Sequence, residues 1–225
     1  MDNDVAVIAD FELELDDHED DRSKYTPVED RALRLLGRDN RVAISLRQPR
    51  TVETEEPGRA AYDIGLMLAL HPHPRCRFAW ARLLVDLSST PDAIIEDMVP
   101  HEVDGRAVDV ETRVGLGLKF AAVFSTVDLE ANPELARKSS VFLPRMTASG
   151  IGFRKAYWDF TAHGGDYLHT NGELRLLVSA PVGQAVTASM AVRAHLRLPG
   201  LMNLVPVRKR RDAAATVELV SLPAF

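Results

Sequence analysis

Hydrophobic and polar residues alternate most regularly in the stretch VDVETRVGLGLKF, residues 108–120. One set of alternate positions holds Val108, Val110, Thr112, Val114, Leu116, Leu118 and Phe120. The other set carries charges, namely Asp109, Glu111, Arg113 and Lys119. A period of two residues predicts a β-strand with one buried face. Gly115 and Gly117 lie among the outward positions, where missing side chains favour a bend.

The same alternation returns in residues 185–198, which predict a second long strand. Shorter strand candidates are residues 5–15, 41–47, 62–70, 77–87, 140–144, 150–160, 172–180 and 216–222. Gly, Pro, Asn and Asp residues separate them, as is typical of antiparallel folds. The pattern predicts a mainly β protein, an antiparallel β-sandwich or open barrel of about nine or ten strands.

One short N-terminal helix is expected after residue 25. Thr26 can cap it, Pro27 occupies the first helical position, and Glu29 completes a capping box. Gly37 is a plausible end.

The chain of 225 residues is expected to form a single domain, 1–225, with a packed core. Its hydrophobic content of 46% and charged content of 27% are ordinary for globular proteins. Two charge-rich stretches, 16–24 and 47–59, bury too little apolar surface to offset chain ordering, so we expect mobile acidic loops there.

Charge and cysteine content favour a cytoplasmic protein. The net charge of −6 gives no general attraction to nucleic acid or anionic lipid, and a single cysteine forms no internal disulfide. The acidic start lacks the pattern of a signal peptide, and no apolar run approaches the ~20 residues of a membrane-spanning helix. These features predict no membrane partner. Twenty-two arginines against five lysines indicate a bacterial, GC-rich genome.

The motif HPHPRC, residues 71–76, is the first candidate for chemistry. His71 and His73 fall on one side of an extended backbone, and Cys76 offers a third metal ligand. Arg75 and Arg77 repel a cation, however, and a proline-stiffened connection between two strands explains the motif equally well. We expect the connection, with a metal site as the alternative.

A second histidine cluster lies in HGGDYLH, residues 163–169. Loops host binding sites more often than cores do, and His163 and His169 are further candidate metal ligands. A site that joins them with His71 and His73 requires the two loops to meet. No cofactor is predicted.

The basic run VRKRR supplies the one concentrated positive segment. Its candidate binding residues are Arg208, Lys209, Arg210 and Arg211. A solvated hairpin tip is the simpler interpretation, because no aromatic residues are interleaved to stack on bases. Nucleic acid is therefore an unlikely partner.

Catalytic signatures are missing, which disfavours an enzyme. The chain has no Gly-x-Ser-x-Gly elbow and no phosphate-binding glycine loop. Trp80 and Trp158 alternate with apolar residues, so both are expected in the core.

These observations favour a non-enzymatic protein-binding or assembly module, which binds a protein partner or forms a homo-oligomer through a sheet edge. The alternatives are a metal-dependent enzyme or small-molecule binder built on the histidine loops, and a nucleic-acid-binding protein that uses residues 207–211.

Overall fold

The computed structural model describes residues 5–15, 40–54, 56–103, 107–113, 121–124, 136–142, 145–162, 168, 173–197, 204–209 and 216–221. Within them the regular elements are β-strands. The strands are β1 (Val5–Leu15), β2 (Arg41–Arg47), β3 (Arg50–Val52), β4 (Arg59–His71), β5 (Arg77–Asp86), β6 (Ile94–Val99), β7 (Glu102–Val103), β8 (Ala107–Arg113), β9 (Ala121–Phe124), β10 (Ala136–Phe142), β11 (Met146–Ser149), β12 (Lys155–Thr161), β13 (Glu173–Pro181), β14 (Val186–Arg197), β15 (Leu204–Lys209) and β16 (Thr216–Val220).

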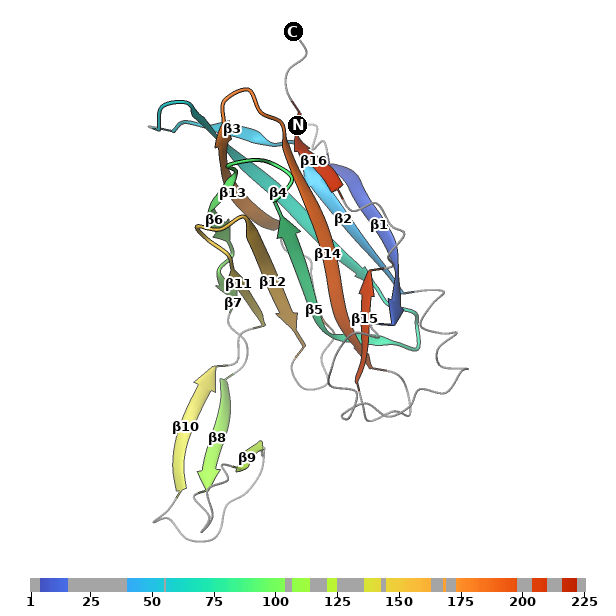
Figure 1. The fold of residues 1–225 in the computed structure, drawn as a ribbon. Coiled ribbons are helices and arrows are strands. Elements are labelled where there is room, and N and C mark those ends of the chain that lie inside the picture. The colour runs from blue at the N-terminus through green and yellow to red at the C-terminus, as the bar shows by residue number, and fades with distance from the viewer. Residues whose placement is uncertain are drawn as a thin grey trace.

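Thirteen strands form one large antiparallel sheet that curls strongly (Figure 1). Its strand order is β6-β13-β4-β2-β1-β15-β14-β5-β12-β11-β7, with β16 beside β14 and β3 beside β4. Strand β1 joins the two halves of the sheet: residues 5–12 pair with β2, and residues 13–15 pair with β15. A register shift between Val7 and Ala9 marks a bulge in the part of β1 that pairs with β2.

One hydrophobic core lies inside the curl, because the inward positions of both halves are apolar. Ile44, Leu66 and Leu176 come from β2, β4 and β13, and all three are fully buried. The other half contributes the fully buried Leu83 on β5 and Trp158 on β12. All belong to a single cluster. The apolar residues at alternate positions of the strands in both halves thus form this core.

A glycine turn between β11 and β12 holds one edge strand in place. Ile95 of β6 donates its N–H to the Phe153 carbonyl at 3.0 Å, and Gly152 donates to the Ile95 carbonyl at 2.7 Å. Gly150 has φ of 126°, and a Cβ there would lie 2.3 Å from the Lys155 carbonyl oxygen. Only glycine fits this position. The turn therefore ties the β6 edge to the opposite half of the sheet.

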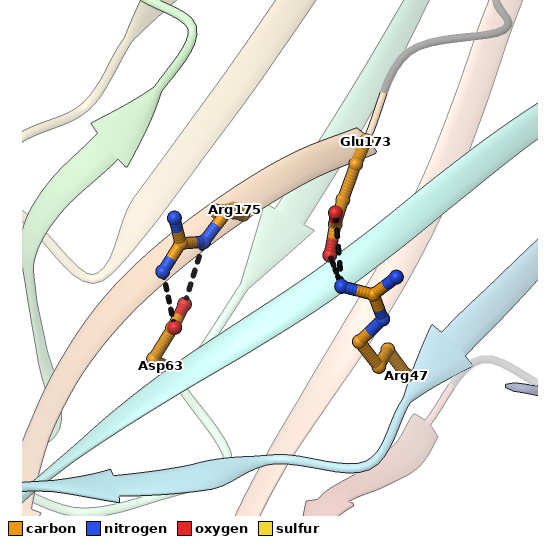
Figure 2. A network of polar contacts seen from close by, with 4 residues as sticks. All are labelled: Arg47, Asp63, Glu173 and Arg175. Carbon is orange, nitrogen blue, oxygen red and sulfur yellow. Dashed lines mark hydrogen bonds and ion pairs between the residues drawn. The ribbon is translucent and has the colours of Figure 1, made fainter. Parts of the chain in front are cut away.

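On the outer surface, ion pairs join β2, β4 and β13 (Figure 2). Arg47 Nη1 lies 3.0 Å from Glu173 Oε1, and Arg175 forms a bidentate pair with Asp63. Gly65 of β4 lies between Arg47 and Glu173, and a Cβ there would approach Glu173 Oε1 to 2.6 Å. Because Gly65 has no side chain, the ion pair between Arg47 and Glu173 has room to cross β4.

The prediction of a mainly β, antiparallel fold is confirmed, but the strand number is larger than expected. The described residues hold sixteen strands rather than nine or ten, most of them in one continuous curled sheet. They contain no helix, and the predicted helix after Thr26 lies outside them, as does the stretch 16–24. The stretch 47–59 contains strand β3, which pairs with β4.

Candidate functional site

Strands β7 to β11 lead out from the edge of the large sheet and back to it. At the sheet edge β7 pairs with β11, with Val103 opposite Met146. Farther out β8 pairs with β10, with Ala107 opposite Phe142. Strand β9 adds a third strand next to β8. Figure 1 shows this three-stranded sheet, β10-β8-β9, well away from the large sheet. We refer to residues 102–149 as the hairpin.

Backbone hydrogen bonds fix the root of the hairpin to the large sheet. Arg145 donates its N–H to the Val103 carbonyl at 2.8 Å, and Ala148 donates to the His101 carbonyl at 2.7 Å. Thr161 of β12 donates to the Arg145 carbonyl at 2.8 Å. The segment around β11 is therefore hydrogen-bonded to β7 on one side and to β12 on the other.

The alternating stretch 108–120 lies in this hairpin, and its first part forms β8. The register places Val110 opposite Phe124 and Thr112 opposite Ala122 in β9. The even-numbered residues of β8 and of β9 therefore share one side of the three-stranded sheet. The charged positions Glu111 and Arg113 fall on the other side.

Strand β10 does not repeat the apolar pattern. Its Ser139 lies opposite Val110, and its Arg137 lies opposite Thr112. Directly opposed residues of an antiparallel pair share a face of the sheet. Two of the three even-numbered positions of β8, Val110 and Thr112, are thus paired with polar residues of β10, whereas Val108 is paired with Val141.

The HPHPRC motif forms a tight turn between β4 and β5. Cys76 donates its N–H to the His73 carbonyl at 2.7 Å, and the His73 N–H is bound by Asn40 Oδ1 at 2.9 Å. The Nδ1 atom of His73 accepts the Arg75 N–H at 3.1 Å, so this ring nitrogen already has a partner within the turn. Burial raises the pKa of the Cys76 thiol, although a hydrogen bond with Asn40 lowers it in part. His71 is exposed at the end of β4.

The predicted metal site stays a prediction. Ala162 donates its N–H to the Ala79 carbonyl at 2.9 Å, so the residue before the second histidine loop lies beside β5. His163 and His169 themselves lie outside the described residues. Among the residues that the structure does describe, no three His, Cys, Asp or Glu side chains gather as metal ligands.

The basic segment begins in a strand rather than in a hairpin tip. Arg208 and Lys209 belong to β15, where they lie opposite Glu14 and Leu13 of β1. Arg208 Nε is 3.3 Å from Glu14 Oε1. Arg210 and Arg211 lie outside the described residues.

Trp158 is fully buried as predicted, but the prediction for Trp80 is wrong. The pairing of β5 with β14 shifts by one residue between Trp80 and Phe78, which is a bulge. Phe78 and Ala81 consequently both point into the core, and Trp80 lies half-buried on the outer face. The sequence carried no signal for this bulge.

Trp80 belongs to an aromatic and charged cluster that sequence reasoning missed. Its ring is 4.8 Å from the His195 ring, centroid to centroid. The Arg82 guanidinium lies 5.5 Å from the Trp80 ring and 4.1 Å from the Tyr157 ring. Arg82 also binds Asp159 through two hydrogen bonds of 2.7 and 2.6 Å. The cluster joins β5, β12 and β14, which are separate in the sequence.

No family model matches the chain, and no curated protein matches it. Three solved structures resemble it at 9% identity each. The delta-toxin of Clostridium perfringens has a TM-score of 0.37 and covers 80% of this chain and 82% of its own. The Clostridium perfringens NetB toxin in its membrane-inserted form has a TM-score of 0.36, with 79% and 88% covered. A pore-forming protein has a TM-score of 0.31, with 80% and 85% covered.

These neighbours contradict several predictions made from the sequence. The sequence predicted a cytoplasmic binding or assembly module without a membrane partner, with a metal-dependent enzyme and a nucleic-acid-binding protein as alternatives. The neighbours are named as toxins and as a pore-forming protein, which disagrees with these predictions. We withdraw those predictions. Within the described residues, no helix has the length and hydrophobicity to cross a membrane.

Proposed function

We propose that this protein forms membrane pores by inserting the segment of residues 107–124 into a lipid bilayer as one strand. The observation that carries the proposal is the alternation of residues 108–120 within the hairpin. A strand of about 9–11 residues spans the hydrocarbon layer, and a spanning strand alternates apolar residues toward lipid with polar residues toward water. The stretch meets both requirements.

The same physics requires several copies of the chain. Unpaired backbone N–H and C=O groups are too costly in hydrocarbon, so an inserted strand needs partners on both sides. One alternating strand per chain does not provide them. Several chains arranged in a ring would supply neighbours to every strand, with the charged positions Asp109, Glu111 and Arg113 facing a water-filled interior.

The three-stranded sheet of the hairpin represents the form before insertion. Its register puts Arg137 on the same face as Val108 and Val110. An arginine on a lipid-facing position costs about 2–4 kcal/mol at the middle of the bilayer. Insertion therefore requires residues 107–124 to separate from β10. The large curled sheet, a sandwich-like body around one core, remains folded outside the membrane in this proposal.

The test compares two substitutions of the same residue type. Val110→Arg places a charge among the even-numbered positions, whereas Val123→Arg places it opposite Glu111, among the charged ones. A cost of about 2–4 kcal/mol per inserted strand corresponds to at least roughly a thirtyfold loss of insertion. We expect Val110→Arg to abolish dye release from lipid vesicles and Val123→Arg to preserve it.

Dye release is measured on vesicles with protein of matched concentration and confirmed folding. Equal release by the two variants, or no release by the unmodified protein at any lipid composition, would reject the proposal.

A further inference from the structure

A small hollow lies on the outer surface of the large sheet, over β2, β3, β4 and β13. Its volume is about 130 Å³, below the roughly 300–1,000 Å³ of sites that enclose a drug-sized ligand. It therefore has room for one small polar group. Gly65 lines it, and the missing side chain leaves space next to Glu173. The charged side chains of the lining are Arg47, Arg50, Asp63, Glu173 and Arg175.

Two of the three arginines in the lining are oriented by carboxylates, and Figure 2 shows both ion pairs. Arg47 contacts Oε2 and Oε1 of Glu173 through Nη1, at 3.1 and 3.0 Å. Arg175 binds Asp63 through Nε and Nη2. Within the described part of the chain, Nε and Nη2 of Arg47 and Nη1 of Arg175 are left as donors for a further acceptor. A guanidinium that is already oriented loses little freedom when it binds an anion.

The third arginine has no carboxylate of its own. Arg50 of β3 lies directly opposite Asp63, but Asp63 already accepts two hydrogen bonds from Arg175. Arg50 is exposed, and among the described residues its side chain has neither an ion pair nor a hydrogen bond. The lining thus holds three guanidinium groups and two carboxylates, an excess of one positive charge.

Four other carboxylates on β6 and after β3 stand outside the hollow. Glu96 and Asp97 belong to β6, which is one strand beyond β13. Glu53 and Glu56 follow the end of β3, and Glu56 Oε2 is 3.4 Å from Arg59 Nε. None of the four lines the hollow. The positive excess is therefore a property of the hollow and not of the whole sheet face.

Exposed apolar side chains border the hollow on the same face. Val5 of β1 lies directly opposite Arg47, and Val99 of β6 lies directly opposite Arg175. Met67 of β4 is two residues along from the position opposite Arg175. These three apolar side chains are between 37% and 45% exposed. Directly opposed residues share a face of the sheet, so an anionic group in the hollow would have apolar surface beside it.

We propose that this hollow binds a small oxyanion, such as a phosphate or sulfate group, that is attached to an apolar group. The oxyanion accepts charge-assisted hydrogen bonds from Arg47, Arg50 and Arg175, while Asp63 and Glu173 keep their own arginine partners. The apolar group covers the exposed side chains at the border of the hollow. The site does not depend on insertion of residues 107–124 into a membrane.

Calorimetric titration with inorganic phosphate at constant ionic strength tests the anionic part of the site. We expect saturable binding of one phosphate per chain. Arg50→Gln removes the arginine without a carboxylate partner and should weaken phosphate binding at least about tenfold. Glu173→Gln should tighten phosphate binding, because the lining then has two excess positive charges.

The matched control is Arg41→Gln, which removes the same charge from an exposed arginine on β2. Arg41 is paired with Asp10 at 2.6 Å and lies roughly 20 Å along the strand from Arg47, beyond the screening length of about 8 Å at physiological salt. We expect its affinity for phosphate to equal that of the unmodified protein. Equal weakening by Arg41→Gln and Arg50→Gln, or no saturable binding of phosphate, would overturn the proposal.

Hexyl phosphate tests the apolar part of the site. Each methylene that is buried contributes about a fourfold factor, so hexyl phosphate should bind at least about tenfold more tightly than inorganic phosphate. Met67→Gln should reduce this preference and leave the affinity for inorganic phosphate unchanged. Equal affinities of the unmodified protein for the two phosphates would contradict a ligand with an apolar group.

Vesicles distinguish a membrane lipid from a soluble ligand as the source of the phosphate. Vesicles of phosphatidylcholine with phosphatidic acid present a phosphate group on apolar chains. Co-sedimentation that hexyl phosphate reverses would assign the site to a lipid headgroup, whereas binding of hexyl phosphate without co-sedimentation would assign it to a soluble ligand. Both assignments require Arg50→Gln to weaken the binding of hexyl phosphate. Undiminished binding of hexyl phosphate by Arg50→Gln would overturn the proposal.

Discussion

The large curled sheet and the hairpin contain strands with the same alternation but with different partners. In the large sheet, Val192 of β14 lies opposite Leu83 of β5, and both are buried in the core. In the hairpin, Val110 lies opposite Ser139, and Thr112, the next residue on the same face of β8, lies opposite Arg137. An alternating pattern therefore indicates one apolar side, but the opposing strand decides what that side contacts. Two of the three even-numbered positions of β8 lie opposite polar residues of β10, which agrees with the proposal that this stretch contacts lipid.

The largest expected difference between the two regions concerns a buried charge. Val192→Asp places an unpaired carboxylate in the core of the large sheet, so we expect a loss of more than about 4 kcal/mol in the free energy of unfolding. Val110→Asp occupies a position opposite a serine, so we expect a loss below about 1 kcal/mol. Denaturant unfolding of both variants measures the difference. Similar losses would mean that the two alternating strands have equivalent surroundings.

A smaller effect is expected at the glycine turn that ties the β6 edge to the opposite half of the sheet. Gly150→Ala introduces a Cβ that meets the Lys155 carbonyl oxygen at 2.3 Å, in a backbone with φ of 126°. We expect a loss of about 3 kcal/mol in unfolding free energy. Gly58→Ala is the matched control, because Gly58 also has a positive φ, 79°, but open space around it. Its loss should be about 1 kcal/mol. If Gly150→Ala leaves the free energy of unfolding unchanged, the close approach of position 150 to the Lys155 carbonyl would be refuted.

The smallest effect concerns pH. Burial alone raises the pKa of Asp86, but hydrogen bonds from Ser88 and Lys155 outweigh it, so the pKa lies below its ordinary value. A lowered pKa in the folded state stabilises the protein above the unfolded pKa of about 4, and this contribution is lost as the pH falls through the folded value. The Lys155 side chain is 62% exposed, so the contribution is below about 1 kcal/mol.

Asp86→Asn should remove this part of the pH dependence. The thermal midpoints of the variant and the unmodified protein are therefore expected to differ more at pH 7 than at pH 3. A difference that stays constant over this range would contradict the assignment.

Much of the fold could be predicted from the sequence because burial in a sheet imposes a period of two. The stretches around β2, β4, β5, β12, β13 and β14 were all identified, and the buried Trp158 was placed correctly. Strand partners could not be predicted, because register depends on contacts between distant residues. The outward position of Trp80 depends on a bulge that has no local signature.

The candidate site was partly visible in the sequence. The alternation of 108–120 was the clearest pattern in the chain, but it predicted a strand with a buried face rather than a hairpin beyond the large sheet. The outward Arg193 and Arg197 were also evident from the pattern of β14. Their alignment with Arg82 and Arg208 required the pairing of strands from three separate stretches, which no local pattern contains.

The most direct test locks β8 to β10. Val110 and Ser139 are directly opposed, within the Cα separation that a disulfide requires, so Val110→Cys with Ser139→Cys should form one on oxidation. A matched double variant, Ser189→Cys with Thr216→Cys, joins β14 to β16 in the large sheet. Dye release from anionic vesicles is then measured before and after reduction. The account predicts that the oxidised hairpin variant releases no dye until it is reduced, whereas the oxidised control releases dye throughout. Full release by the oxidised hairpin variant would contradict the central claim that residues 107–124 leave β10 to enter the membrane.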